Sequence, residues 1–348
     1  MAQLKDITVL ITAAGNVYMP GTTRCLRENG ERNIRLVGAD MNDDPTMLEM
    51  FDVYYPVPRG DSPEYVDVLL DICARERVDV ILPIMSVELE ALAANRKKFE
   101  QIGTQVSVSD LVPLRIANNK LSLFDYMVEK GFPCAGYRAV KSADTLYQAA
   151  LDLGYPDVPV CVKTTSGSGS RGFRILDAKL SKYDILFHQK PTSCYTTLDE
   201  LMEILRSAES IPEMMVMEYL PGTEYTVDLL ADHGKVLYNC CREGLLMENS
   251  IMLDGIIVDA KQVLDRCAEV VEALGLDGNI GFDVRERADG TAMIMECNPR
   301  ITAGIAAFHA AGVNLPYLCI KKLLGEALPA VEPRFGTKMK RRYTEMYC

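Results

Sequence analysis

The stretch GFDVRERADGTAMIMECNPR, residues 281–300, decides the fold of the carboxyl-terminal half. Two apolar runs flank a short Ala-Asp-Gly turn, which is the pattern of a β-hairpin. Side chains two positions apart on a strand share one face, so Glu296 and Asn298 point the same way, and Asp283 can lie opposite them. Two carboxylates and an amide oxygen suit Mg²⁺, which retains waters and bridges nucleotide phosphates. The hairpin therefore predicts a magnesium site that works together with a triphosphate.

Arg300 continues in step with Glu296 and Asn298. Its guanidinium would lie where charge grows on a transferring phosphoryl group. A polar hairpin end with a surface ion pair is the alternative. Carboxylates aligned on one face of an otherwise apolar strand repel each other unless a cation is present, so the functional interpretation is favoured. Cys297 lies between two residues that face the metal, and we expect it to pack on the opposite side.

A second motif is CVKTTSGSGSRGF, residues 161–173. A predicted strand reaches Lys163 and continues into a glycine-serine loop that includes Ser168, Gly169 and Ser170. Bare backbone amides and small hydroxyls wrap phosphate oxygens closely, and the lysine supplies a compact positive charge. A loop of this kind is more often merely flexible, so its interpretation depends on the acidic hairpin.

The sequence outside these motifs predicts two kinds of sheet. The runs ITVLITAAG (7–15), IRLVGAD (34–40) and VDVILPI (78–84) alternate with helical stretches, which is typical of an open parallel sheet. Later strands follow one another through hairpins, which favours antiparallel pairing. We expect an α/β and α+β chain with a Rossmann-like domain over 1–112, a two-lobed unit over 113–325 and a tail over 326–348. The two lobes are expected at about 133–216 and 217–325.

The first glycine turn also permits a dehydrogenase interpretation. The GxGxxG fingerprint is missing, however, because Asn16 to Pro20 separate Gly15 from Gly21. A dinucleotide site is therefore disfavoured.

Composition excludes several classes of partner. The formal charge is −12 and no basic stripe with interleaved aromatics occurs, which disfavours nucleic acid. No apolar run reaches the roughly 20 residues that span a bilayer. The 11 cysteines are scattered, with no CxxC pair and no secretory leader, so a cytoplasmic protein with reduced thiols is expected. The basic residues between Lys338 and Arg342 are interpreted as a solvated tail, with a docking or substrate-facing tail as the alternative.

Four segments, in this order, resemble the ATP-grasp superfamily, and most closely its carbamoyl phosphate synthase-like, biotin carboxylase-like and D-alanine ligase-like members. They are NNKLSLFDYM (118–127), CVKTTSGSGSRG (161–172), MEYLPGTEYTVDLL (217–230) and Asp283 with MECNPR (295–300). The resemblance runs to about residue 325 and makes the first domain a pre-ATP-grasp domain and 133–216 its lid.

The resemblance implies roles for individual residues. Lys120 and Lys163 would contact nucleotide phosphates under the lid loop. The hinge backbone at Met217, Glu218, Tyr219 and Leu220 would bind adenine, and Glu224 would hold the ribose. Asp283, Glu296 and Asn298 would bind the metal, and Arg300 would face the acyl phosphate. Lys120 as an ordinary surface lysine and Glu224 as a partner of a neighbouring charge are the alternatives.

The implied reaction uses ATP with Mg²⁺, or Mn²⁺ in its place. A carboxylate is activated as an acyl phosphate, with Lys163 and Arg300 as catalytic residues, and passes to an amine or another nucleophile with release of ADP and phosphate. A carbamoyl phosphate synthase-like enzyme that forms carboxyphosphate or carbamate, and a non-catalytic ATP-binding regulator, are the alternatives. The resemblance also implies a homodimer. Arg242, in CCREG, is a candidate for holding a substrate carboxylate, with a surface salt bridge as the competing interpretation.

Overall fold

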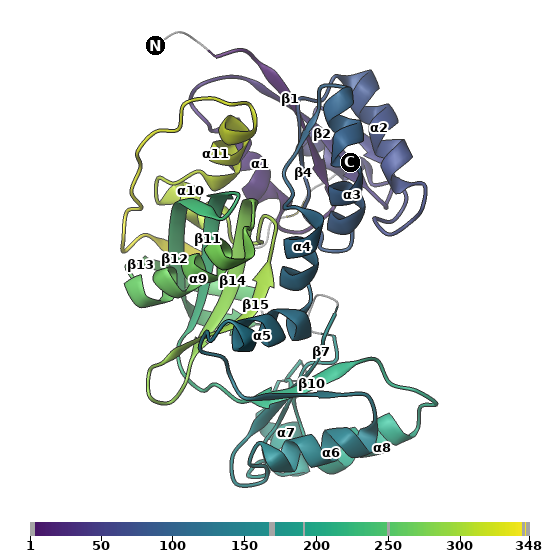
Figure 1. The fold of residues 1–348 in the computed structure, drawn as a ribbon, viewed down its shortest axis with the longest axis vertical. Helices are drawn as coiled ribbons and strands as arrows, with labels where there is room; N and C mark the ends of the chain where they lie inside the picture. Colours follow the sequence, from purple (N-terminus) through teal and green to yellow (C-terminus); the bar gives the residue numbers. More distant parts are fainter. Residues whose placement is uncertain (1–3, 167–170, 191, 249–250, 343–344, 346–348) are drawn as a thin grey trace.

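The computed structural model describes residues 4–166, 171–190, 192–248, 251–342 and 345. These residues form one parallel sheet, one mixed sheet and one antiparallel sheet (Figure 1). The predicted fold class, a parallel α/β domain followed by a two-lobed unit built on antiparallel pairing, is confirmed.

The first sheet has five parallel strands in the order β3-β2-β1-β4-β5. Its strands are β1 (Ile7–Thr12), β2 (Ile34–Asp40), β3 (Val53–Pro56), β4 (Val80–Leu82) and β5 (Gln105–Val106). The helices in this part are α1 (Met19–Arg27), the 3₁₀ helix η1 (Pro45–Glu49), α2 (Tyr65–Glu76) and α3 (Leu89–Gln101). Because β1 is the central strand, its apolar side chains are buried on both faces. The Gly15 amide donates to Asp40 Oδ2 at 2.9 Å, so Asp40 holds the turn after β1.

The second sheet forms the lower lobe in Figure 1, with the order β6-β10-β7-β8-β9. Its strands are β6 (Tyr137–Val140), β7 (Val160–Thr164), β8 (Arg174–Leu176), β9 (Tyr195–Thr196) and β10 (Met214–Glu218), and its helices are α6 (Ala143–Asp152), α7 (Lys182–His188) and α8 (Leu198–Arg206). The expected boundary at about residue 216 falls within β10, an inner strand that pairs with β6 and with β7 as far as Glu218.

The third sheet is antiparallel, in the order β15-β14-β11-β12-β13-β16. Its strands are β11 (Glu224–Asp232), β12 (Lys235–Glu248), β13 (Ile251–Val258), β14 (Gly278–Glu286), β15 (Ala292–Asn298) and β16 (Lys338–Lys340). The associated helices are α4 (Leu111–Ala117), α5 (Lys120–Glu129), α9 (Lys261–Leu274), α10 (Ala306–Ala310) and α11 (Leu315–Leu323).

The expectation of a solvated tail is wrong for residues 338–341. β16 pairs with β13, and Lys340 forms an ion pair with Asp254 at 3.0 Å. Arg341 Nη2 donates to the Ala303 carbonyl at 2.6 Å. Lys340 and Arg341 therefore fasten this segment to the third sheet, whereas the Lys338 side chain stays exposed.

A shared core joins the first domain to the third sheet. It combines residues of β1, β2 and α1 with α10 and α11, which pack on α1. The second sheet has its own core and meets the third sheet through a smaller apolar cluster that includes Phe124, Met217 and Met293. The lower lobe is therefore attached through fewer apolar contacts than the other two parts are to each other.

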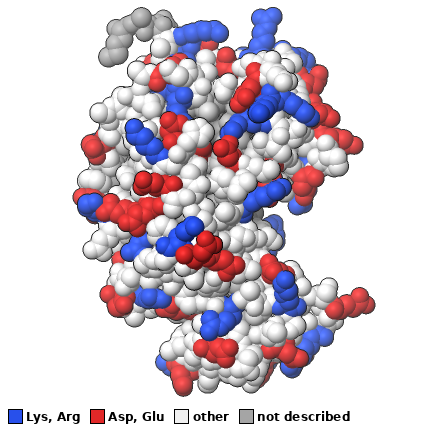
Figure 2. Space-filling view, in the orientation of Figure 1, with Lys and Arg blue, Asp and Glu red and all other residues white. Residues whose placement is uncertain are grey.

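Positive and negative side chains intermingle on the face drawn in Figure 2, where no broad basic area gathers. None of the helices that the structure describes is both long enough and apolar enough to cross a membrane.

Candidate active site

The β14–β15 hairpin brings two carboxylates into direct opposition. Asp283 pairs with Glu296 in the strand register, and Asn298 Nδ2 lies 3.4 Å from Asp283 Oδ2. Burial raises the pKa of Asp283 to about 7, and the neighbouring charge of Glu296 adds to this effect. Two carboxylates opposed in this way favour either a proton or a cation between them.

A break in the hairpin register creates the contact with Lys163. Asp283 pairs with Glu296 but Val284 pairs with Ile294, so Met295 is an extra residue, as in a β-bulge. Lys163 Nζ donates to the Met295 carbonyl at 3.0 Å. Burial lowers the pKa of Lys163 to about 8, with a smaller contribution from the like charge of Lys120.

Lys120 reaches the same hairpin from the first turn of α5. Asn119 caps this helix by accepting from the Ser122 amide, and the Lys120 amide donates to the Thr165 carbonyl at 3.0 Å. Lys120 Nζ lies 3.3 Å from Glu296 Oε1. Lys120 is therefore not an ordinary surface lysine, since its side chain is only 13% exposed. Two lysines from distant segments thus meet the acidic hairpin.

Arg300 bridges the hairpin and the first domain. Its Nη2 donates to Asn298 Oδ1 at 3.1 Å, and its Nε donates to Ser86 Oγ at 3.2 Å. Among the described residues, no carboxylate lies within the 4.0 Å ion-pair distance of this guanidinium. Burial lowers the pKa of Arg300. The group is a largely buried cation whose closest partners are neutral.

The predicted hinge is the end of β10 and the residues that follow it. Met217 and Leu220 are buried in the cluster between the lower lobe and the third sheet, and Tyr219 is partly buried against it. The Glu218 carboxylate accepts two hydrogen bonds from Arg287, both 2.8 Å long, and one from the Gly136 amide at 3.1 Å. These bonds lower the pKa of Glu218 and commit its side chain to the protein itself. The Glu218 amide is committed as well, since it donates to the Gly136 carbonyl at 2.8 Å.

Glu224 begins β11 and lies 3.1 Å from Arg285 Nη2. Burial raises its pKa. The alternative of a charge partner is thus realised in this structure, and a ribose-binding role stays a prediction. Ser168, Gly169 and Ser170 lie outside the described residues.

Two charged residues on the same face extend the cluster. Arg242 is 3% exposed and donates from Nη1 to the Gly304 carbonyl at 2.8 Å, so its interpretation as a surface salt bridge is wrong. Asp228 is 1% exposed and accepts from Thr302 Oγ1 at 2.8 Å. Sequence reasoning missed Asp228. The signal for it was the alternation of Glu224, Thr226 and Asp228 along one face of β11.

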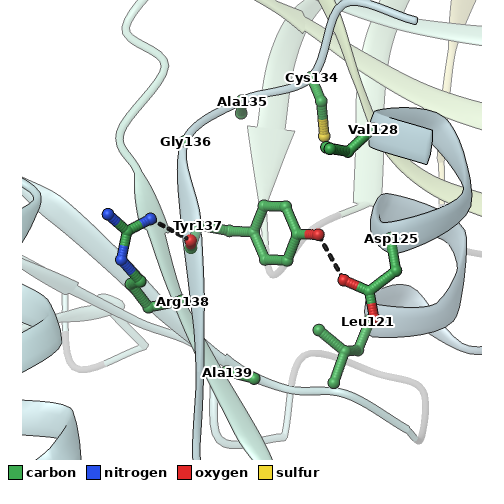
Figure 3. A pocket seen from close by; sticks show the side chains of 9 residues that line it. All are labelled: Leu121, Asp125, Val128, Cys134, Ala135, Gly136, Tyr137, Arg138 and Ala139. Atoms are coloured by element: carbon green, nitrogen blue, oxygen red, sulfur yellow. Dashed lines mark hydrogen bonds between the residues drawn. The ribbon is translucent and has the colours of Figure 1, made fainter. Parts of the chain in front are cut away.

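A surface concavity between α5 and β6 is lined by residues such as Asp125, Cys134 and Tyr137 (Figure 3). The Tyr137 hydroxyl donates to the Asp125 carboxylate across it. None of the predicted site residues lines this concavity, so it is separate from the charged cluster.

The donor set at the hairpin fits a hard divalent cation. Asp283, Glu296 and Asn298 offer two carboxylates and an amide oxygen from adjacent strands, and the opposition of the two carboxylates makes a cation favourable there. Magnesium prefers such oxygen ligands and shares them with phosphate oxygens.

Comparisons with known proteins agree with this arrangement. Residues 210–345 match the family model "ATP-grasp in the biosynthetic pathway with Ter operon", and residues 9–107 match "PylC-like, N-terminal domain". The carbamoyl phosphate synthase large chain of Methanobrevibacter smithii is 24% identical over 94% of this chain, and that of Kineococcus radiotolerans is 25% identical over 93%. This chain spans only 31% and 29% of those relatives.

Solved structures share the fold at low identity. The biotin carboxylase domain of Hydrogenobacter thermophilus 2-oxoglutarate carboxylase, described in complex with MgADP and bicarbonate, has a TM-score of 0.69 at 16% identity, covering 96% of this chain and 73% of that one. An ADP complex of N5-carboxyaminoimidazole ribonucleotide synthetase has a TM-score of 0.65 at 18% identity, with coverage of 94% and 80%. The L-amino acid ligase of Bacillus licheniformis has a TM-score of 0.64 at 16% identity, with coverage of 94% and 76%.

Proposed function

Because residues 210–345 match an ATP-grasp family model, we propose that this chain is an ADP-forming ligase of the ATP-grasp superfamily that activates a carboxylate as an acyl phosphate and transfers it to an amine. The observation that carries the proposal is the convergence of Lys120, Lys163 and the acidic hairpin, with 3.3 Å from Lys120 Nζ to Glu296 and 3.0 Å from Lys163 Nζ to Met295 O. A triphosphate with its metal ion would give both the lysines and the carboxylates a counter-charge.

Each residue has a role in this proposal. Lys120 and Lys163 bind phosphate oxygens, and the backbone from Met217 to Leu220 binds adenine within its apolar cluster. Asp283, Glu296 and Asn298 would hold Mg²⁺, which neutralises phosphate charge when bound. Arg300, a cation with neutral neighbours, stabilises the negative charge that grows on the transferred phosphoryl group. Catalysis then rests on positioning and charge neutralisation, without a covalent enzyme intermediate.

A homodimer and a cytoplasmic location stay predictions. The description of the Hydrogenobacter domain as a dimer supports the first. Size-exclusion chromatography with light scattering would test it.

The test is release of ADP and phosphate from Mg-ATP with pools of amino acids, small carboxylates and bicarbonate. We expect turnover with at least one pool, and a loss of about 10²-fold or more in Lys163→Ala and Glu296→Ala. Lys141→Ala is the matched control, because Lys141 belongs to the same lobe and its side chain is 78% exposed.

Three outcomes would contradict the proposal. Turnover that survives both substitutions would show that the cluster is not the reactive site. Binding of ATP without turnover in any pool would favour the non-catalytic regulator. Turnover with bicarbonate alone would favour carboxyphosphate formation instead of amide synthesis.

A further inference from the structure

The strand order of the third sheet aligns charged side chains in two rows. Arg242, Thr226, Asp283 and Glu296 are successive register partners across β12, β11, β14 and β15. The next row holds Cys240, Asp228, Gly281 and Asn298. Partners in register share a face, so Asp228 lies diagonally between Arg242 and the predicted metal ligands.

Arg242 and Asp228 are buried charges with unused bonding capacity. Arg242 Nε and Asp228 Oδ2 are both buried and have no hydrogen-bond partner. No ion pair within 4.0 Å involves either side chain among the described residues. A buried charge without a close counter-charge is costly, and so is a buried polar atom without a hydrogen bond. A bound ligand can supply the hydrogen bonds that Arg242 Nε and Asp228 Oδ2 do not make within the protein.

The surroundings keep the two groups in place. A Cβ on Gly304 would lie 2.0 Å from the Arg242 guanidinium, so the bare backbone there makes room for it. A Cβ on Gly281 would lie 2.1 Å from Thr302 Cγ2, the side chain whose hydroxyl donates to Asp228. The guanidinium also lies 5.6 Å from the centroid of the Phe308 ring. Gly304 thus leaves room for the Arg242 guanidinium, and Gly281 leaves room for Thr302, which donates to Asp228.

We propose that Arg242 and Asp228 bind the nucleophile and that it is an α-amino acid, with its carboxylate on Arg242 and its amino group on Asp228. The Cα atoms of diagonal neighbours on adjacent strands are roughly 7–8 Å apart, so both side chains serve the same part of the sheet face, where one ligand with a carboxylate and an ammonium group can meet them. The amino group then lies on the side of Asp228 that faces Asn298 and Arg300, where the acyl phosphate forms. This inference rests on the proposed ligase function and specifies its acceptor.

Asp228 accepts a proton from the ammonium group in this scheme. The resulting amine attacks the acyl carbon with its lone pair, the new C–N bond forms, and the C–O bond to phosphate breaks with its electrons leaving on phosphate. The second proton lost by nitrogen leaves with the phosphate group. Burial raises the pKa of Asp228 to about 6, which strengthens it as a proton acceptor, although Arg242, Thr302 and Arg300 act in the opposite direction.

The experiment separates activation of the carboxylate from attack by the amine. Wild type and Asp228→Asn are given Mg-ATP and a mixture of the common L-amino acids, with and without hydroxylamine. Hydroxylamine is largely neutral at pH 7 and traps an acyl phosphate as a hydroxamate without needing a proton acceptor. Hydroxamates are measured by their iron colour and dipeptides by mass spectrometry.

We expect Asp228→Asn to lose dipeptide formation by about 10²-fold or more while hydroxamate formation stays within a few-fold of wild type. Retained hydroxamate formation also shows that the variant is folded. Asp232→Asn, at the exposed end of the same strand, is the control and should keep both reactions. Arg242→Gln should raise the KM for the amino acid acceptor at least tenfold with hydroxamate formation retained.

The remaining outcomes decide against the inference. Equal retention or equal loss of both reactions in Asp228→Asn would overturn the role of Asp228. Hydroxamates without any dipeptide in wild type would overturn the amino acid acceptor and leave the ligase function standing. Absence of hydroxamate and of ADP release in wild type would remove the ligase function, and this inference with it.

Discussion

Lys163 carries its ammonium group into a buried position, 3.0 Å from the Met295 carbonyl and 5.3 Å from the centroid of the Phe124 ring. Burial penalises the charged form more than the nearby carboxylates favour it, which is why the pKa falls to about 8. Among the described residues, Arg242, Asp228 and Arg300 have no ion pair within 4.0 Å. At the scale of single residues, the site is therefore built from groups that weaken folding and prepare binding.

The Lys163 ammonium should make stability depend on pH. The pKa of this group is about 8 when the chain is folded and 10.5 when the side chain is fully solvated, as in the unfolded chain. Between these values the unfolded chain binds a proton that the folded chain does not, so stability rises with pH, by up to about 1.4 kcal/mol per unit. Lys163→Met lacks this proton. The difference in free energy of unfolding, wild type minus variant, should therefore increase between about pH 8 and pH 10 in urea titrations.

The variant controls for all other titrating groups, since these are common to both proteins. A difference that stays flat or falls over this pH range would contradict the lowered pKa of the buried Lys163.

The order of strands in the third sheet decides which side chains meet. Strands β11 and β12 are adjacent in the chain, but β14 and β15 enter on the other side of β11 after α9 intervenes. This order lines up Arg242 with Asp283 and Glu296 across four strands. β16 forms the edge of this sheet beyond β13. Arg341, which follows β16, donates to the Ala303 carbonyl, and Arg242 donates to the carbonyl of the next residue, Gly304. The loop of residues 302–304 is thus held from both sides.

Gly304→Ala should disturb this loop through Arg242. The added Cβ would lie 2.0 Å from both terminal guanidinium nitrogens, so Arg242 must move and lose its bond to the 304 carbonyl. We expect a loss of about 1–3 kcal/mol in the free energy of unfolding, the usual cost of overpacking. Chemical denaturation of the purified variant measures it.

A double-mutant cycle with Arg242→Gln identifies the cause. In the Arg242→Gln background the same glycine substitution should cost markedly less, because the clashing group is gone. If Gly304→Ala lowers the free energy of unfolding equally in both backgrounds, the clash with Arg242 is not the cause.

The whole molecule consists of a two-part body and a lobe attached through a small apolar cluster. The first domain and the third sheet share one core, whereas the lower lobe contacts them mainly through residues such as Phe124 and Met217. The lobe carries Lys163 and the hinge, and the body carries the acidic hairpin and Arg300. The predicted nucleotide site therefore lies between parts that ligand binding should hold together.

Mg-ATP should consequently stabilise the whole chain against heat. At a concentration 100 times the Kd, a ligand that binds only the folded state contributes about 2.7 kcal/mol, a shift of a few degrees in Tm for a chain of this size. NAD should give no shift, because the turn after β1 lacks the dinucleotide fingerprint. Differential scanning fluorimetry with each nucleotide measures both. Protection by NAD and not by Mg-ATP would favour the dehydrogenase interpretation.

The sequence by itself determined the parallel first sheet, the antiparallel third sheet, the hairpin of residues 281–300 and the opposition of Asp283 to Glu296. These features follow from periodicity and short turns, in which the interacting residues are close in the chain. Asp228 could also have been predicted from the sequence, since it continues the alternation of Glu224 and Thr226 along one face of β11.

Only the tertiary structure decided the remaining relationships. The contact between Ser86 and Arg300, the burial of Arg242 beneath Gly304 and the docking of β16 on β13 join segments that are far apart in sequence. No local pattern encodes such contacts. They depend on how the sheets pack, because burial and register across a sheet arise only when distant strands and loops come together.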